Sequence, residues 1–256
     1  MRHPTLRLAV MAALVAALGA TTLAQRGGFG RRSQRFFQPS YSANVPYDGK
    51  FVFVRMSYPV YGRRDAGWAH DWPIGEQNFM TIFSTITNTP SHVHESSILD
   101  FGDPEMFRFP VIYLCEPGDW DLSAEGAVAL RDYLVKGGFL IVDDFPRNAW
   151  GNFDLQMSKA FPTAQWIELG PEHPIFHTFF EIDPYTVLAS YNLGGQPAFY
   201  GLFEDNDPTK RMYVIANYQN DLSEFWEASS TGYQLVSESN EAYKIGINQF
   251  VYGITR

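Results

Sequence analysis

The segment from residue 110 to residue 144 limits the possible folds most, because two largely apolar runs flank one amphipathic helix. The runs cover Pro110–Glu116 and Phe139–Asp144, and such runs are typical of central parallel strands covered on both faces. Between them, Ser123 suits the N-cap of a helix and Gly137-Gly138 suits its end. A parallel crossover needs a helix of about this length, so the segment predicts a strand–helix–strand unit.

The rest of the chain alternates in the same way. In the segment 76–87, Phe79, Ile82, Phe83 and Ile86 recur at the spacing of one helix face. Further strands are predicted at 51–56, 165–169 and 211–218, and further helices at 152–161 and 241–254. This alternation predicts an α/β, doubly wound domain with a mainly parallel sheet, helices on both faces, and elaborations between residues 171 and 208.

Residues 1–24 have the layout of a secretory signal. Arg2 and Arg7 precede an uncharged run from Leu8 to Ala20, which is shorter than the roughly 20 residues that a membrane-spanning helix needs. Small residues place the cleavage site after Ala24. We therefore expect an exported protein, periplasmic or secreted, with no transmembrane helix in the mature chain; retention of the signal as an anchor is the alternative.

The mature chain is predicted to be acidic and free of disulfides. Without Arg2 and Arg7 it holds 17 of the 19 Lys and Arg residues against 28 Asp and Glu, a net charge near −11. Nucleic-acid binding depends on Lys and Arg, so nucleic acid is not an expected partner. Cys115 is the one cysteine, and no internal disulfide can form. Residues 25–47, rich in Arg and Gly, suit a flexible linker, which leaves 48–256 as a single domain.

Ligands of doubly wound folds gather at the carboxyl ends of the parallel strands. The adjacent acids Asp143 and Asp144 are the strongest candidates, because carboxylates leaving a buried strand must meet a cation or hydrogen-bond donors. A hard cation such as Mg²⁺ or Ca²⁺ could bind them. In the alternative, one aspartate caps the next segment and the other pairs with Arg147. Three further candidates at strand ends are Tyr58, Glu116 and Asn217.

Two loops combine aromatic and polar residues, one within 58–72 and one within 217–226. Aromatic faces beside hydrogen-bonding groups can stack on a sugar or clamp a peptide. A lid packed on the domain is the alternative interpretation. The candidate ligand-binding residues of these loops are Trp68, His70, Trp72, Asp221 and Trp226.

The remaining histidines are weaker candidates. His92 and His94 would share one face of an extended segment and could hold a transition metal, but no further ligand signature accompanies them. His173 follows Gly170-Pro171-Glu172 and could contact a ligand, although orienting a turn is the simpler role. Metal binding by histidine is therefore the less favoured interpretation.

Sequence motifs of common catalytic sites are missing. Cys115 lacks flanking glycines, and Pro117 has no N–H for an oxyanion hole, which favours a buried, inert thiol. The chain contains no G-x-S-x-G, no P-loop and no dinucleotide fingerprint. We therefore predict no cofactor.

Several motifs in order resemble the bacterial domain of unknown function numbered 4159, over about residues 51–256. They are the strand–helix–strand unit 111–145, His173-Pro174-Ile175-Phe176, 201–205, Ala216-Asn217 with Asp221, and 240–253. The resemblance implies a flavodoxin-like sheet, similar to class I glutamine amidotransferases but without their catalytic triad at matching positions. Members look like exported single domains or the tails of membrane-anchored proteins, and this chain looks like the first kind. Because the family has no assigned reaction, the resemblance leaves the function open.

Two functional hypotheses follow. The first is a non-catalytic module of the cell envelope that binds a ligand or protein partner, neither of which the sequence identifies. It would use Asp143, Asp144 and the aromatic loops. The alternative is a hydrolase of a glycan or peptide, in which Asp143 or Asp144 acts as base, directly or through a metal, and His173 or Glu116 as acid. The missing nucleophile and cofactor motifs favour the binding module over an enzyme.

Overall fold

A computed structural model of the protein describes residues 44–61, 67–187 and 196–256. The predicted signal, 1–24, and most of the predicted linker, 25–47, lie outside these residues. The Asn44 side chain exchanges two hydrogen bonds of 2.8 Å with the backbone of Ile98. Contacts with the folded domain therefore begin inside the predicted linker.

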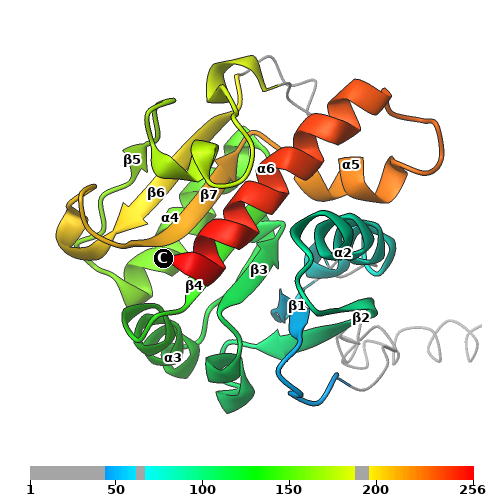
Figure 1. Ribbon diagram of the computed structural model, residues 1–256. Coiled ribbons are helices and arrows are strands. Elements are labelled where there is room, and N and C mark those ends of the chain that lie inside the picture. Colours follow the sequence, from blue (N-terminus) through cyan, green and yellow to red (C-terminus); the bar gives the residue numbers. More distant parts are fainter. Residues whose placement is uncertain (1–43, 62–66, 188–195) are drawn as a thin grey trace, which may run out of the picture. The chain divides into compact units, whose positions relative to one another are not determined.

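Seven strands form one sheet in the order β2-β1-β3-β4-β7-β6-β5 (Figure 1). Their bounds are β1 Phe51–Ser57, β2 Ser91–Asp100, β3 Val111–Cys115, β4 Phe139–Phe145, β5 Ile167–Glu168, β6 Ala198–Phe203 and β7 Met212–Tyr218. The first five in this order pair in parallel, and β6 and β5 extend the sheet with antiparallel pairings. The parallel part has the flavodoxin-like strand order, which confirms the predicted α/β, doubly wound class.

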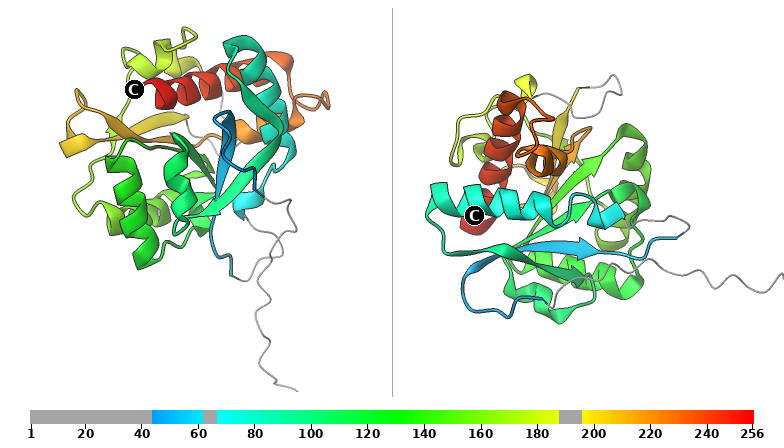
Figure 2. Two further views of the ribbon diagram at one scale, coloured as in Figure 1. Left: turned by 60° about the horizontal axis from the view of Figure 1, so that its bottom comes forward. Right: turned by 90° about the vertical axis from the view of Figure 1, so that its right-hand side faces the viewer.

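Helices cover both faces of this sheet. Residues of α2 (Ile74–Thr87), α5 (Leu222–Ala228) and α6 (Val236–Thr255) share one hydrophobic core. Residues of α3 (Ala124–Val135) and α4 (Trp150–Ala160) share the other. The left view of Figure 2 shows α6 in red and α3 in green on opposite sides of the sheet. Successive strand residues point to opposite faces, so the central strands contribute to both cores, and β3 is buried over its whole length.

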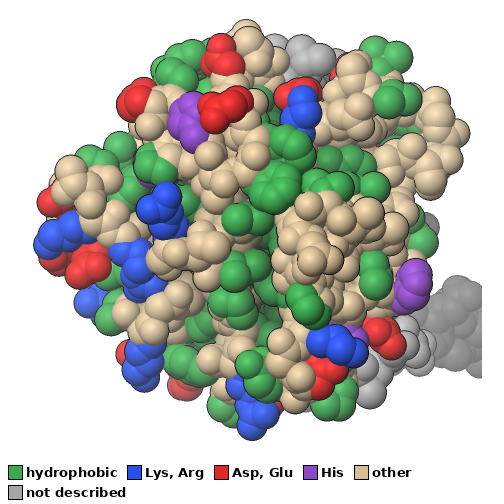
Figure 3. All heavy atoms as spheres, viewed as in Figure 1, with side chains coloured by type: hydrophobic (Ala, Val, Ile, Leu, Met, Phe, Trp, Pro, Cys, Tyr) green, Lys and Arg blue, Asp and Glu red, His purple; other side chains and the backbone are tan. Residues whose placement is uncertain are grey.

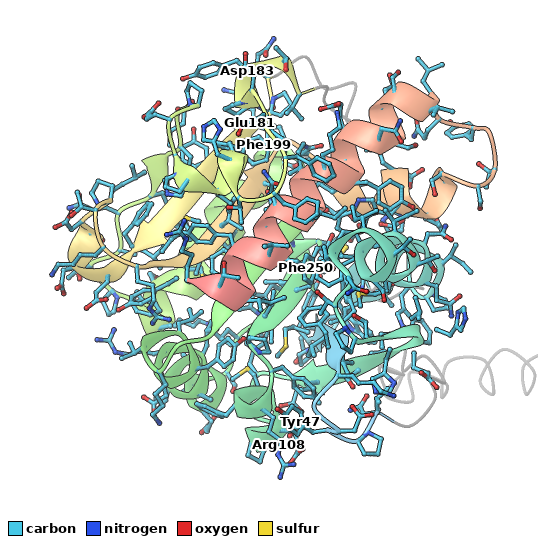
Figure 4. All side chains as sticks on the ribbon, in the orientation of Figure 1. Tyr47, Arg108, Glu181, Asp183, Phe199 and Phe250 are labelled. Atoms are coloured by element: carbon cyan, nitrogen blue, oxygen red, sulfur yellow. The ribbon has the colours of Figure 1, made fainter. Side chains whose placement is uncertain are left out.

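Aromatic side chains join α2 and α6 to the sheet. Phe250, labelled in Figure 4, projects from α6, and its ring centroid lies 5.2 Å from that of Phe53 and 4.8 Å from that of Phe79. The predicted face of α2 is partly wrong: Ile82 and Ile86 are 38% and 40% exposed. The buried face instead begins at Glu76 and continues through residues 79, 80 and 83, because Glu76 is drawn inward to a buried arginine described below.

None of the helices within the described ranges is long and apolar enough to cross a bilayer.

The surface carries both signs of charge. On the face viewed in Figure 3, most Lys and Arg side chains lie toward the left and lower edges, interspersed with Asp and Glu. On this face, then, the two signs of charge are mixed.

The predicted N-cap of α3 is confirmed and gives a simple stability test. The Ser123 hydroxyl accepts the backbone N–H of Gly126 at 2.9 Å. We expect Ser123→Ala to lower the free energy of unfolding by about 1 kcal/mol, because the helix N-terminus loses this acceptor. Urea denaturation measures the change, and Ser123→Asp, which retains an acceptor, is the control. Equal unfolding midpoints for Ser123→Ala and the parent would contradict this role.

Candidate functional site

Four polar residues at the carboxyl edge of the parallel strands adopt the left-handed backbone conformation. Their φ angles are 62° at Asp71, 47° at Glu116, 52° at Asp144 and 55° at Gln219. Glu116 follows β3, Asp144 lies near the end of β4, and Gln219 follows β7. Such conformations cost about 1–3 kcal/mol each for non-glycine residues and cluster at functional sites. These backbone conformations therefore mark the carboxyl edge of the sheet, which is where doubly wound folds bind their ligands.

Three aspartates and one histidine converge there. One ligand atom from each of His70, Asp71, Asp144 and Asp221 lies within 4.8 Å of all the others. His70 Nδ1 is 3.0 Å from Asp144 Oδ2, 3.6 Å from Asp71 Oδ1 and 3.9 Å from Glu116 Oε1. The aspartates are buried, whereas the His70 side chain is 46% exposed. We call these four residues the acidic cluster, and His70 forms its outer side.

The electrostatics of the acidic cluster favour a bound positive charge. Burial raises the pKa of Asp71 and of Asp221, and the neighbouring carboxylates raise both further. The hydrogen bond to Asp144 raises the pKa of His70 to about 9, with the three nearby carboxylates adding to the shift. The protonated form of His70 is therefore favoured at neutral pH, because the neighbouring carboxylates stabilise its positive charge.

Arg55 of β1 is a buried cation near the acidic cluster, but its ion-pair partner is Glu76 and not one of the aspartates. Its side chain is fully buried and forms an ion pair with Glu76 of α2. It also donates hydrogen bonds of 2.8 Å to the carbonyl oxygens of Trp68 and His70. Arg55 thus holds the segment that carries His70 and Asp71 against the sheet.

The two adjacent aspartates of β4 have different roles. Asp143 is fully buried and accepts hydrogen bonds from the Tyr113 hydroxyl (2.6 Å), Asn217 Nδ2 (2.9 Å), and the backbone N–H groups of Leu222 (2.8 Å) and Ser223 (3.2 Å). Burial raises its pKa to about 6. Asp143 therefore attaches the start of α5 to the sheet, and only Asp144 turns into the acidic cluster.

The predicted alternative partner of this pair, Arg147, plays no such part. Arg147 is exposed in the short helical turn that follows β4. Asp143 is satisfied by the four donors above, and Asp144 Oδ2 contacts His70 and, at 3.4 Å, the Cys115 thiol. Asp143 therefore has the hydrogen-bond donors that a buried carboxylate needs, and none of them is an arginine.

An open pocket adjoins the acidic cluster. It has a volume of about 330 Å³ and is lined by Glu116, Gly118, Asp119, Asp144, Pro146, Asn148 and Ala149. Asp144 belongs to both the pocket and the cluster. A smaller cavity of about 100 Å³ between α5 and α6 is mostly apolar and is lined by none of the predicted site residues. The pocket at the strand ends is therefore the better ligand site.

Tyr58 and Asn217 are buried supports of this edge. The Tyr58 hydroxyl donates to the carbonyl oxygens of Glu116 (2.5 Å) and Cys115 (3.1 Å), and so holds the turn that presents Glu116. Asn217 exchanges two amide hydrogen bonds with Gln249 of α6. Both residues position the site and neither lines its pocket.

The three predicted tryptophans are distributed differently. Trp68 is 4% exposed and Trp226 1% exposed. The Trp226 indole packs against Phe79, with ring centroids 4.4 Å apart. Trp72 is partly buried and donates from Nε1 to Ser96 Oγ at 3.1 Å. Trp68 and Trp226 therefore belong to the cores, which agrees with the alternative interpretation that these loops pack on the domain.

The other three candidate histidines, His92, His94 and His173, do not join the acidic cluster. His173 packs against Tyr252, which contacts Phe139 at the start of β4, and burial lowers the pKa of His173 to about 4. Its Nδ1 accepts the N–H of Ile175, which suits the turn-orienting role. His92 contacts Asp48 and Glu95 at the start of β2. In the described ranges, neither His92 nor His94 joins a group of three metal-ligating residues.

Several residues of the site were not among the predicted candidates. Asp71 belongs to the acidic cluster, Asp119 and Asn148 line the pocket, and the Ser223 hydroxyl lies 2.6 Å from Asp71 Oδ2. Asp71 stands between His70 and Trp72 in the predicted aromatic loop, and this position was the one sequence feature that could have identified it.

Cys115 is a buried thiol. Burial raises its pKa well above the ordinary value, which keeps the thiol protonated.

Comparison with known proteins identifies the family of this chain. The model of the family described as "Domain of unknown function (DUF4159)" matches residues 51–254, which include every strand described above and every helix except the last residue of α6. No curated protein matches the chain. Because the family match covers most of the sequence, the chain belongs to the DUF4159 family.

Proposed function

We propose that this protein is an exported, non-catalytic binding module of the cell envelope, which holds a neutral, hydroxyl-rich ligand of the sugar class. The observation that carries the proposal is the 330 Å³ pocket whose wall combines Glu116, Asp119 and Asp144 with the amide of Asn148. Pockets of roughly 300–1,000 Å³ hold small organic ligands, so one sugar unit suits this space.

The chemistry of the wall favours hydroxyl groups. Ionised carboxylates only accept hydrogen bonds, and each sugar hydroxyl can donate one. The Asn148 side chain adds both a donor and an acceptor. A phosphate or carboxylate ligand would instead meet like charge at three positions. The pocket is therefore suited to a neutral ligand with several hydroxyl groups.

Hydrolysis is the second candidate function, and the position of His70 supports it. His70 carries a proton at neutral pH and lies 3.9 Å from Glu116 Oε1 beside the pocket. A proton donor next to a carboxylate is the arrangement that general acid–base catalysis needs. Asp143 does not serve this reaction, because four hydrogen bonds occupy it.

Titration with small sugars tests the binding proposal. We expect N-acetylglucosamine or glucose to bind the purified mature chain in a calorimetric titration, and glucose 6-phosphate to bind more weakly because of charge repulsion. Glu116→Ala should weaken sugar binding by about tenfold or more, through loss of a charge-assisted hydrogen bond. Asp132→Ala, at an exposed carboxylate near the end of α3, is the control that should leave binding unchanged.

Two results would count against these ideas. If Glu116→Ala and Asp132→Ala bind sugars equally, the pocket is not the site. If a di- or trisaccharide is cleaved by the parent chain and not by His70→Gln, the protein is a hydrolase and not a binding module.

Export is tested separately. The full chain, expressed in a bacterial host, should yield a periplasmic or secreted product that begins at Gln25. An unprocessed product in the cytoplasm would contradict export, and an unprocessed product in the membrane fraction would support the anchor.

A further inference from the structure

We infer that Asp71, Asp144 and Asp221, together with His70, form a binding site for one divalent metal cation. The inference rests on the proposed function in one respect: Asp144 borders the sugar pocket, so a cation there could also contact a ligand hydroxyl. Cation binding itself requires no organic ligand and is tested without one.

The buried carboxylate of Asp71 is the first reason. Its Oδ1 is buried and, among the residues that the structure describes, has no hydrogen-bond partner. The same atom lies 3.6 Å from His70 Nδ1 and therefore faces into the acidic cluster. Its Oδ2 is already bonded to Ser223 Oγ at 2.6 Å. A buried acceptor without a donor is destabilising by about 1–3 kcal/mol, and a bound cation would satisfy it.

Two of the carboxylates are held in place by other groups of the protein. Asp221 Oδ1 accepts the N–H of Glu224 at 3.0 Å, and Asp71 Oδ2 accepts the hydroxyl of Ser223 at 2.6 Å. One oxygen of Asp71 and one of Asp221 are thus oriented by a donor other than the proposed ligands, which leaves the second oxygen of each for coordination. Pre-oriented ligands of this kind bind metal more tightly.

The spacing fits a hard cation. The four candidate ligand atoms lie within 4.8 Å of one another. Two oxygens on opposite sides of a cation are about 4.2 Å apart for Mg²⁺ and about 4.8 Å apart for Ca²⁺. Three carboxylates suit Mg²⁺, Ca²⁺ or Mn²⁺, and one imidazole favours a transition metal. Water or a ligand hydroxyl would complete the coordination shell.

Further carboxylates near Asp71 also favour a bound cation. Glu224 and Glu227 also lie with Asp71 in a second group of carboxylates within 4.8 Å. Arg55, the nearest buried cation, is paired with Glu76. A divalent cation would offset the repulsion that this arrangement creates.

The experiment is a calorimetric titration of the chelator-treated mature chain with Mn²⁺, Mg²⁺, Ca²⁺ or Zn²⁺, without sugar. We expect one site, and a higher melting temperature with the bound cation. Asp221→Asn should weaken cation binding by about tenfold or more. Because asparagine is also a good N-cap and removes a buried like charge, this variant should fold at least as stably as the parent without metal. Asp132→Asn is the matched control and should bind like the parent.

A second variant identifies the class of cation. If His70 is a ligand, His70→Gln should weaken the binding of Mn²⁺ and Zn²⁺ more than the binding of Mg²⁺ and Ca²⁺. If the aspartates alone bind the cation, His70→Gln should weaken the binding of all four only slightly and equally. Either result supports the site. Absence of binding for all four cations at about 1 mM, or binding that Asp221→Asn and Asp144→Asn leave unchanged, would overturn the inference.

The two proposals can fail independently. Cation binding without sugar binding would retain this site and remove the proposed function. Sugar binding that is unchanged by chelator, with no measurable cation binding, would retain the function and remove this site.

Discussion

Asp143→Ala is expected to lower the free energy of unfolding by about 3–5 kcal/mol, because it leaves several buried donors without an acceptor. The donors are the Tyr113 hydroxyl and the backbone N–H groups of Leu222 and Ser223, together with the Asn217 amide. Asn217 keeps a second partner in Gln249, which limits the loss at that position. Small domains are stable by about 5–15 kcal/mol, so this single change would remove a large share.

Urea denaturation at neutral pH measures this loss, and two neighbouring changes serve as controls. Asp143→Asn retains one acceptor oxygen and should be destabilised less than the alanine variant. Asp144→Asn removes the adjacent carboxylate, which belongs to the acidic cluster, and should leave the chain close to the stability of the parent. An Asp143→Ala variant within about 1 kcal/mol of the parent would show that the hydrogen bonds are not formed as described.

Arg55→Met is expected to be destabilising by about 3–5 kcal/mol for a different reason. The variant leaves Glu76 buried as a carboxylate without its ion-pair partner. The double change Arg55→Met with Glu76→Met should recover most of the lost stability, because replacing both partners of a buried pair by apolar residues is often neutral. Denaturation of the two single variants and the double variant gives the coupling energy directly.

The same variants connect the fold with the acidic cluster. Arg55 also donates to the carbonyl oxygens of Trp68 and His70. The double variant should therefore regain stability but bind Mn²⁺ more weakly than the parent, since the segment carrying His70 and Asp71 is held less firmly. A double variant as unstable as Arg55→Met alone would contradict the ion-pair explanation.

Part of the candidate site could be predicted from local sequence. Glu116 and Asp144 end apolar runs, and Asp221 precedes the first turn of a helix, so the common position of strand ends brings them together. The choice between Asp143 and Asp144 could not be made in this way. Both leave the same strand, and the direction of each side chain depends on the pleat and on the left-handed backbone at Asp144.

Other parts depend on burial that sequence does not report. Trp226 stands in a polar loop sequence, yet it is buried against Phe79 because α5 packs on α2. Glu76 shares the helix face of Phe79 and Phe83, but a carboxylate is not expected in a core, and its ion pair with Arg55 of β1 accounts for its burial. In both cases the partner is distant in the chain, and local periodicity carries no information about it.

Local patterns by themselves predicted most of the strands and helices, the cap of α3 and the edge at which polar residues collect, but they did not predict β2, β6 or α5. These features follow from the spacing of apolar residues and from the stereochemistry of serine, glycine and proline, which act over a few residues. Only the tertiary structure decided that Asp143 is a buried support and that Asp71 joins Asp144 and Asp221. For the three aspartates to meet, three chain segments must pack over one sheet edge, and the energy of that packing comes from contacts between residues far apart in the sequence.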